Sequence, residues 1–193
     1  MATWTEALRR AEMVAVGAAL TRRGLVRGRE GNLSCRLADG DVLLTPAGAD
    51  KGRMLAENLR RCSPHNPPEA GVSSEARMHF AIYRRCPQVL SVVHAHPVAV
   101  LSLAALGRSP DPRMLREGAA LVSRIEVVQS LQPGSRELAE ECARALERAP
   151  VAILLEHGVV CGGDDLWQAL GRVEILELLA GIELGRSGSV VPI

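Results

Sequence analysis

The hydrophobic positions along the chain follow two alternating periods, one typical of helices and the other typical of strands. Several segments have apolar residues at helical spacing with a capping signal in front of them. These predicted helices begin at Thr3 with Glu6, at Ser73 or Ser74, at Ser135 and at Asp164 or Asp165, and end near Leu20, Cys86, Arg148 and Leu184. A further helix is predicted from Pro97 to Gly107, because proline is favoured in a first turn.

Strand signals lie between these helices. Short apolar or alternating runs occupy 33–37, 42–45, 89–93, 121–128 and 151–155, and the first two predict a hairpin around Ala38-Asp39-Gly40. Residues 55–61 predict a short helical or irregular segment, and 65–71 predict a loop. Because strands alternate with enough helices for both faces of a sheet, we expect a single α/β domain over 1–193.

Composition and charge exclude several classes of protein. The formal net charge is +1 and aromatic residues make up 2% of the chain, so neither nucleic acid nor an acidic membrane is an expected partner. Charged residues interrupt the first twenty positions and no apolar run reaches 18 residues, which predicts a cytoplasmic protein without a signal peptide. The five cysteines are scattered and form no C-x-x-C pair, which predicts reduced structural thiols.

The 23 basic residues include only one lysine, Lys51. A Schiff-base enzyme needs a desolvated lysine. Lys51 lies in a polar, glycine-flanked stretch. The sequence therefore argues against a covalent lysine mechanism.

An H-x-H motif, His94-Ala95-His96, lies at the end of the predicted strand 89–93. Residues two apart in a strand point to the same face, with Cα atoms about 6.6 Å apart, so two imidazoles can converge on one ion. His157 also follows a buried strand and precedes Gly158. Each of these features alone is equally consistent with incidental histidines. Three histidines at strand ends together favour a metal site, because α/β sheets have their sites there.

Glu75 is expected in the first turn of the helix that follows Ser73 and Ser74. A carboxylate there either stabilises the helix dipole or acts as a general acid/base beside a metal, and the spacing alone slightly favours the dipole. His79 lies one turn later and is interpreted as a packing histidine or a supporting partner, not a ligand. His65 lies in a loop and is expected to be exposed.

An anion site is a second interpretation of the same helix start. Free N–H groups and the hydroxyls of Ser73 and Ser74 could bind an anion. The turns at Gly31-Asn32 and Thr45-Pro46-Ala47-Gly48 could supply further donors, although each alone is only a turn.

Taken in order, these segments resemble the class II aldolase/adducin family over roughly residues 5–185. The resemblance rests on Gly31-Asn32-Leu33-Ser34, Leu44-Thr45-Pro46-Ala47-Gly48, Ser73-Ser74-Glu75 with His79, His94-Ala95-His96-Pro97 and His157-Gly158. The enzymes of that family include fuculose-phosphate aldolase and ribulose-phosphate 4-epimerase. The ordered set of motifs is specific, whereas each motif alone is not.

This resemblance implies a three-layer α/β/α sandwich with a mixed, mostly antiparallel central sheet, assembled as a homotetramer. It implies one Zn²⁺ per chain on His94, His96 and His157. Glu75 would be the acid/base and could also bind the resting zinc. The implied phosphate-binding positions are Asn32, Gly48, Ser73 and Ser74.

Two positions depart from the family pattern. Ala47 stands where the family often has Ser or Thr, so one hydroxyl for phosphate is missing. The catalytic tyrosine of the aldolases, expected near 113–117, has no counterpart, because the only tyrosine is Tyr83. These departures leave the metal chemistry intact and the sugar specificity open.

The implied reaction is retro-aldol cleavage of a ketose 1-phosphate, like fuculose 1-phosphate, to dihydroxyacetone phosphate and an aldehyde. Zinc would act as a Lewis acid and Glu75 would deliver a proton to C3. A sugar-phosphate epimerase, dehydratase or decarboxylase with the same zinc site is the alternative. A catalytically inactive, adducin-like assembly module is a further alternative, against which the histidines and Glu75 argue. A cupin oxygenase would need a nearly all-β pattern.

Overall fold

The computed structural model of the protein describes residues 5–188, and a seven-stranded sheet forms its middle layer. The strands are β1 (Asn32–Arg36), β2 (Val42–Leu44), β3 (Arg60–Cys62), β4 (Ser91–Ala95), β5 (Ile125–Val128), β6 (Val151–Leu154) and β7 (Gly158–Gly163). Their order across the sheet is β3-β2-β1-β4-β7-β6-β5. Only β5 and β6 pair in parallel, and the other neighbours are antiparallel. The expected mixed, mostly antiparallel sheet is therefore confirmed.

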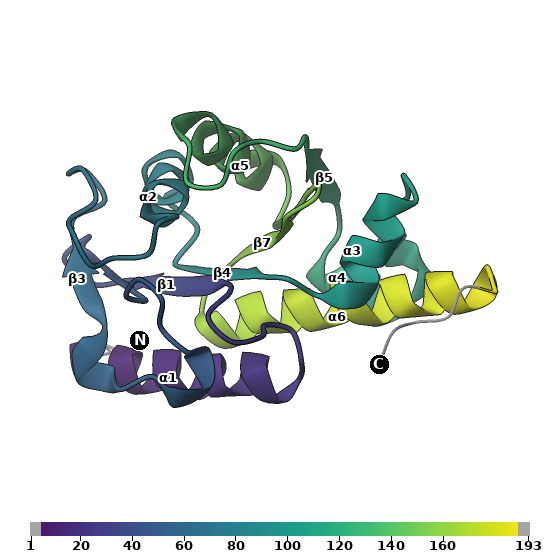
Figure 1. Ribbon diagram of the computed structural model, residues 1–193. Helices are drawn as coiled ribbons and strands as arrows, with labels where there is room; N and C mark the ends of the chain where they lie inside the picture. Colours follow the sequence, from purple (N-terminus) through teal and green to yellow (C-terminus); the bar gives the residue numbers. More distant parts are fainter. Residues whose placement is uncertain (1–4, 189–193) are drawn as a thin grey trace.

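Helices cover both faces of the sheet, as Figure 1 shows. They are α1 (Glu6–Arg22), α2 (Ala76–Arg85), α3 (Val98–Ala105), α4 (Arg116–Leu121), α5 (Arg136–Arg148) and α6 (Leu166–Arg186), with short 3₁₀ helices η1 (Lys51–Arg53), η2 (Ala56–Asn58) and η3 (Pro112–Met114). α1 and α6 lie on one face, and α2 packs beside α5 on the other. α3 and α4 both pack against α6.

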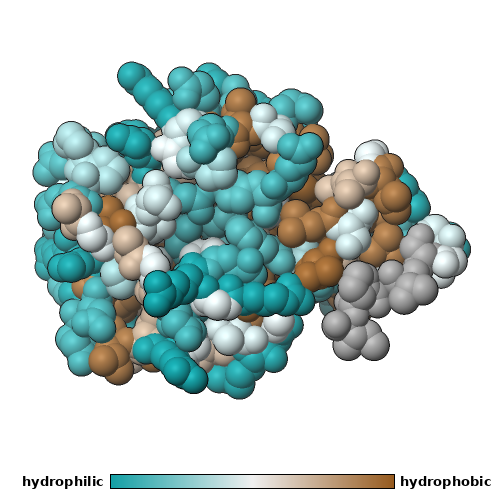
Figure 2. Space-filling model, in the orientation of Figure 1, coloured by the Kyte–Doolittle hydropathy of each residue, from teal (hydrophilic) through white to brown (hydrophobic). Residues whose placement is uncertain are grey.

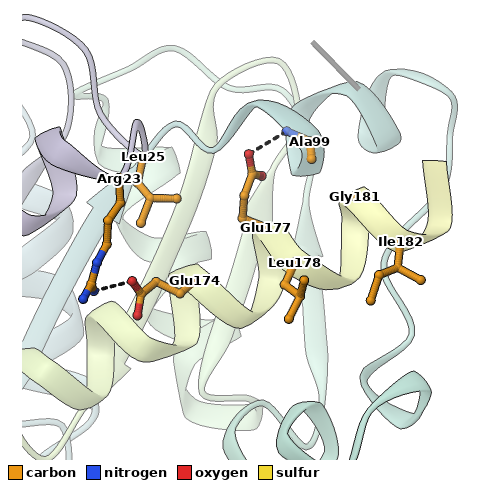
Figure 3. Close-up of a pocket in the computed structure, with 8 residues that line it drawn as sticks. All are labelled: Arg23, Leu25, Ala99, Glu174, Glu177, Leu178, Gly181 and Ile182. Atoms are coloured by element: carbon orange, nitrogen blue, oxygen red, sulfur yellow. Dashed lines mark hydrogen bonds and ion pairs between the residues drawn. The ribbon is translucent and has the colours of Figure 1, made fainter. Parts of the chain in front are cut away.

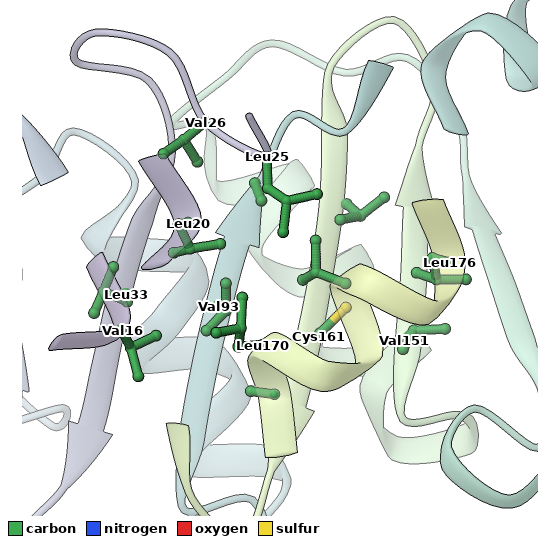
Figure 4. Packing of buried hydrophobic residues seen from close by; sticks show 14 of the residues in the cluster. Val16, Leu20, Leu25, Val26, Leu33, Val93, Val151, Cys161, Leu170 and Leu176 are labelled. Carbon is green, nitrogen blue, oxygen red and sulfur yellow. The ribbon is translucent and has the colours of Figure 1, made fainter. Parts of the chain in front are cut away.

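Successive residues of the central strands supply two separate hydrophobic cores. Val93 and Cys161 point towards α1 and α6, where they join the core shown in Figure 4. Their neighbours Val92 and Val160 point towards α2 and α5. Because side chains alternate between the faces of a strand, each central strand is buried on both sides. This burial makes the middle of the sheet a rigid support for residues at its ends.

Most predicted helix ends agree with the structure. Ser135 caps α5 by accepting from Leu138 N, and Asp165 caps α6 by accepting from Gln168 N. Thr5 caps α1, whereas the predicted cap Thr3 lies outside the described residues.

None of the helices between residues 5 and 188 is long and apolar enough to span a membrane. All five cysteines are free and buried, as expected of reduced structural thiols.

The start of α2 differs from the prediction. Glu75 is the N-cap residue and α2 begins at Ala76, so the placement of Glu75 in the first turn was wrong. Neither predicted serine caps the helix, because Ser73 Oγ instead accepts from Glu75 N at 3.3 Å, within a turn before the helix. This turn directs the Glu75 side chain towards the sheet.

Other strand boundaries were also predicted incorrectly. The expected strand 121–128 is reduced to β5, because Leu121 ends α4 and Ser123 turns the backbone with a φ of 48°. Strands β3 and β7 were missed. β3 has only three residues, and the apolar run of β7 is short and bounded by glycines, so neither has a strong local signal.

Candidate metal centre

The three predicted ligand histidines meet at one end of the sheet. His94 is the next-to-last residue of the central strand β4, His96 follows that strand, and His157 lies in the turn between β6 and β7. Ala95 pairs with Val159, which brings the turn beside the end of β4. The ring centroids are 4.8–5.3 Å apart, and one nitrogen from each ring lies within 4.8 Å of the others.

Two glycines allow this close approach. A Cβ atom at Gly158 would lie 2.5 Å from the Ala95 carbonyl oxygen and 3.0 Å from His94 Cε1. A Cβ atom at Gly31 would lie 2.7 Å from the His94 carbonyl oxygen, and the φ of Gly31 is +69°. Any larger residue at either position would therefore push the histidine cluster apart.

The outer ring nitrogens of two of these histidines have acceptors. His94 Nδ1 lies 2.9 Å from the Val159 carbonyl oxygen, and His96 Nδ1 lies 3.3 Å from Glu30 Oε2. Each Nδ1 therefore carries the proton, and each Nε2 is free to bind a cation. The pKa of His157 is lowered to about 4, mainly by burial, so this ring is neutral at neutral pH. Neutral imidazoles are the form that binds metal.

The inner atoms have the spacing of ligands around one ion. The Nε2 atoms of His94 and His96 are 3.1 Å apart, and the two Glu75 oxygens lie 3.1 Å from His94 Nε2 and 3.3 Å from His157 Nε2. Bonds of ~2.0–2.1 Å to one zinc ion separate its ligands by roughly 3–3.5 Å. Glu75 Oε1 is buried and has no hydrogen-bond partner. Three imidazoles and a carboxylate fit a divalent cation, and zinc among them.

Glu75 is held on its other side by Asn32, whose Nδ2 donates to Oε2 at 2.8 Å. Burial acts to raise the pKa of Glu75, but the facing imidazoles of His94 and His157 and the hydrogen bond from Asn32 lower it below its ordinary value. The carboxylate is therefore ionised in this structure.

A cavity of about 190 Å³ adjoins His96. It brings together the four positions implied for phosphate binding, Asn32, Gly48, Ser73 and Ser74, with Glu75 and His96. It is also lined by Arg29, Glu30 and Lys51, which the sequence reasoning had not assigned to a site. Only the position of Arg29 and Glu30, directly before the Gly31-Asn32 motif, could have indicated from the sequence that they line this cavity.

Lys51 corrects one expectation. The polar, glycine-flanked stretch of sequence does not leave this residue exposed to solvent, because Lys51 is 2% exposed beneath α1. Burial lowers the pKa of Lys51 to about 8. Its Nζ donates to the carbonyl oxygens of Arg29 and Ala49, each at 2.7 Å. Lys51 thus joins the two turns that flank the cavity.

A larger cavity of about 650 Å³ lies elsewhere, along α6 (Figure 3). Its polar groups are already paired. Glu177 accepts from the N–H groups of Ala99 and Val100, and Glu174 forms an ion pair with Arg23. Its other walls are mainly apolar, so size alone does not make this cavity the reaction site.

Comparisons with known proteins agree with this geometry. Residues 11–184 match the family model described as Class II Aldolase and Adducin N-terminal domain. The chain belongs to the class II aldolase and adducin family. A 3-oxo-tetronate 4-phosphate decarboxylase of Haemophilus influenzae is 34% identical over 86% of this chain and 81% of that protein. The L-fuculose phosphate aldolase of Escherichia coli is 32% identical over 86% of this chain and 77% of that protein.

Solved structures of the family have the same fold. The L-fuculose-1-phosphate aldolase of Thermus thermophilus superposes with a TM-score of 0.86 at 28% identity, covering 95% of this chain and 98% of that one. The expected fold class and family are thus confirmed. The enzymes of this family are lyases, decarboxylases among them, that typically use a divalent metal, and the His94, His96 and His157 cluster could hold one.

The catalytic tyrosine that the resemblance to the aldolases led us to expect near 113–117 has no counterpart in this chain. Residues 113–117 lie in η3 and the start of α4 and read Arg-Met-Leu-Arg-Glu. Tyr83 is 2% exposed inside the protein, against Ser34. His79 is fully buried next to Asn32, which agrees with its interpretation as a supporting histidine, and His65 is exposed.

Proposed function

We propose that the protein is a metal-dependent carbon–carbon lyase that removes CO₂ from a phosphorylated 3-oxo sugar acid. The observation that carries this proposal is that Glu75 is the single available acid/base among the described residues that line the cavity. Retro-aldol cleavage needs a base that takes the hydroxyl proton of the departing carbon and an acid that protonates the carbon left behind. Decarboxylation needs only the acid, because CO₂ leaves without transferring a proton.

The other titratable groups around the cavity are already engaged. Glu30 accepts from Arg27 N at 2.5 Å and faces His96. Lys51 bonds to two carbonyl oxygens, and Tyr83 lies in the interior. Glu75 Oε1 has no hydrogen bond, which supports Glu75 as the acid/base among the described residues around the cavity.

His94, His96, His157 and Glu75 would hold the ion, for which we propose zinc at one per chain. A divalent cation there supplies a Lewis acid for the negative charge that develops on the substrate's carbonyl oxygen. When the bond to the carboxylate breaks, its electron pair stays on the carbon beside that carbonyl. Glu75, which is ionised at rest, takes a proton from water and delivers it to this carbon, so the carboxylate is restored after each turnover.

The decarboxylase name of the Haemophilus influenzae relative supports this assignment. Loss of CO₂ from a four-carbon 3-oxo acid 4-phosphate leaves dihydroxyacetone phosphate. Retro-aldol cleavage of a ketose 1-phosphate, the expectation from the sequence, gives the same product. It remains the second candidate because of the aldolase relative.

One experiment separates the two reactions. Zinc-loaded protein is incubated with 3-oxo-tetronate 4-phosphate, and CO₂ and dihydroxyacetone phosphate are both measured. Separate reactions contain an aldehyde with dihydroxyacetone phosphate or with unphosphorylated dihydroxyacetone. We expect equal amounts of CO₂ and triose phosphate from the acid. The proposed function would change to the aldol reaction if the acid releases no CO₂ and dihydroxyacetone phosphate is consumed only when the aldehyde is present.

We further propose that the phosphate group binds at Gly48, Ser73 and Ser74 with help from Arg29. Ala47 lacks the hydroxyl that the family often has beside Gly48. A Cβ built on Gly48 would lie 3.8 Å from Arg29 Nη1, so this guanidinium lies over the same turn. A charged donor there can compensate for the missing hydroxyl.

Arg29→Ala is therefore expected to raise KM for the phosphorylated substrate about tenfold with little change in kcat, since a hydrogen bond to a charged group contributes ~1.5–3 kcal/mol. Ala47→Ser, which restores a hydroxyl, is expected to lower KM about tenfold and to offset Arg29→Ala in the double variant. Arg53→Ala is the control, because the Arg53 side chain is 90% exposed and lies outside the cavity lining. If KM is unchanged in both Arg29→Ala and Ala47→Ser, the substrate's phosphate group does not bind at this turn.

Assembly as a homotetramer remains our proposal from the family resemblance. Figure 2 shows hydrophobic surface on the side of the molecule where α3, α4 and the end of α6 lie. Leu106, after α3, is 57% exposed and Leu178, on α6, is 51% exposed. Apolar surface of this kind supports subunit contact. A cytoplasmic location, a small-molecule substrate, and the absence of nucleic acid and membrane partners stay predictions.

A further inference from the structure

A chain of buried hydrogen bonds leads from Glu75 into the layer between β1 and α2. It alternates between the strand residues Asn32 and Ser34 and the helix residues His79 and Tyr83. Positions two apart on a strand and four apart on a helix each share one face, so the two elements present these groups to each other. The four side chains are 0–4% exposed.

The donors in this chain can be assigned from its end at the carboxylate. Asn32 Nδ2 donates to Glu75 Oε2 at 2.8 Å, so Asn32 Oδ1 faces His79 and accepts from its Nε2–H. His79 Nδ1 then has the lone pair and accepts from Ser34 Oγ at 2.6 Å. Ser34 Oγ accepts in turn from the Tyr83 hydroxyl at 2.8 Å. Every donor therefore points towards Glu75, and the bonds polarise one another.

This chain is unsuited to carrying protons. The Asn32 amide interrupts it, because an amide nitrogen neither gains nor loses a proton readily. Burial lowers the pKa of His79 to about 3 and raises the pKa of Tyr83 above its ordinary value. Both groups remain neutral at neutral pH. The effect of the chain on Glu75 is therefore one of position.

We propose that His79 and Ser34 are positioning residues, which hold Asn32 in the single amide orientation that donates to Glu75. This inference rests on the proposed function, in which Glu75 protonates the substrate carbon. With Oε2 fixed by Asn32, Oε1 lies 3.3 Å from His157 Nε2 and has no hydrogen-bond partner. The Asn32 side chain thereby serves Glu75, which differs from the phosphate-binding role implied by the resemblance.

Loss of the Ser34 hydroxyl tests the inference at a distance from the reacting groups. Without that donor, His79 can move its proton to Nδ1, and Asn32 is then free to rotate its oxygen towards the carboxylate. We expect Ser34→Ala to lower kcat about tenfold, within the ~10–100-fold range for residues that support a metal site, with KM and zinc content unchanged. Tyr83→Phe, one bond further away, is expected to give a smaller loss in the same direction.

Ser91→Ala is the matched control. Ser91 is also fully buried, lies on the neighbouring strand β4 opposite Cys35, and its Oγ has no hydrogen-bond partner. This control should keep the kcat of the unmodified protein. A KM increase in Ser34→Ala without a loss of kcat would show that Asn32 serves phosphate and would overturn the inference.

Nitrogen NMR of the metal-free protein gives a readout that does not depend on activity. We expect His79 as the Nε2–H tautomer in the unmodified protein and in Ser91→Ala, and a changed tautomer in Ser34→Ala. An Nδ1–H tautomer in the unmodified protein, or an unchanged kcat in Ser34→Ala, would overturn the inference. An unmodified protein that has the expected tautomers but catalyses neither reaction would contradict the proposed function alone.

Discussion

Glu75→Gln is expected to lower turnover by ~10²–10⁴-fold, the usual cost of losing a general acid/base. Glutamine preserves the shape of the side chain but cannot transfer the proton. The three histidines remain, so zinc content should be unchanged. The measurement is exchange of the carbon-bound protons of dihydroxyacetone phosphate into deuterated water. This half-reaction is common to decarboxylation and retro-aldol cleavage, and it needs neither CO₂ nor an aldehyde.

A purely structural role for Glu75 predicts a different result. As the N-cap residue of α2 it would contribute ~0.3–1 kcal/mol to the free energy of unfolding and nothing to turnover. Glu137→Gln is the matched control, because Glu137 is an acidic residue in the first turn of the neighbouring helix α5. Near-normal proton exchange in zinc-replete Glu75→Gln would show that a group other than Glu75 transfers the proton.

His96→Ala is expected to remove both bound zinc and activity while leaving most of the fold intact. His96 is 21% exposed in its side chain and follows β4, so its loss creates no large buried cavity. Only two imidazoles would then remain, one fewer than the three protein ligands of a catalytic zinc site with an open position. Metal analysis should find about one zinc per chain in the unmodified protein and far less in the variant.

His65→Ala is the control for this experiment, since His65 is exposed and outside the cluster. Full zinc occupancy in His96→Ala would rule out the proposed ligand set. Absence of any divalent metal from the unmodified protein, purified without chelator, would instead favour the inactive assembly module. Metal content and turnover together therefore distinguish a wrong ligand from a wrong class of protein.

The amino-acid sequence by itself determined the kind of fold and the metal-binding histidine candidates. Local patterns were sufficient for most helix ends, because Ser135 and Asp165 contact backbone groups only three residues away. The H-x-H motif and His157 were recognisable because each lies at the end of an apolar run. Their convergence was an expectation until β4 and β7 were seen to pair.

Tertiary structure alone decided how the residues around Glu75 are used. Lys51 is desolvated because α1 packs over it, and no neighbour in the sequence indicates this. Arg29 reaches the Gly48 turn, and Ser34 reaches His79, across 19 and 45 residues respectively. These contacts depend on how the strands and helices pack together, so local propensity cannot predict them. Sequence periodicity fixes which face of an element a side chain occupies, whereas packing fixes what that face meets.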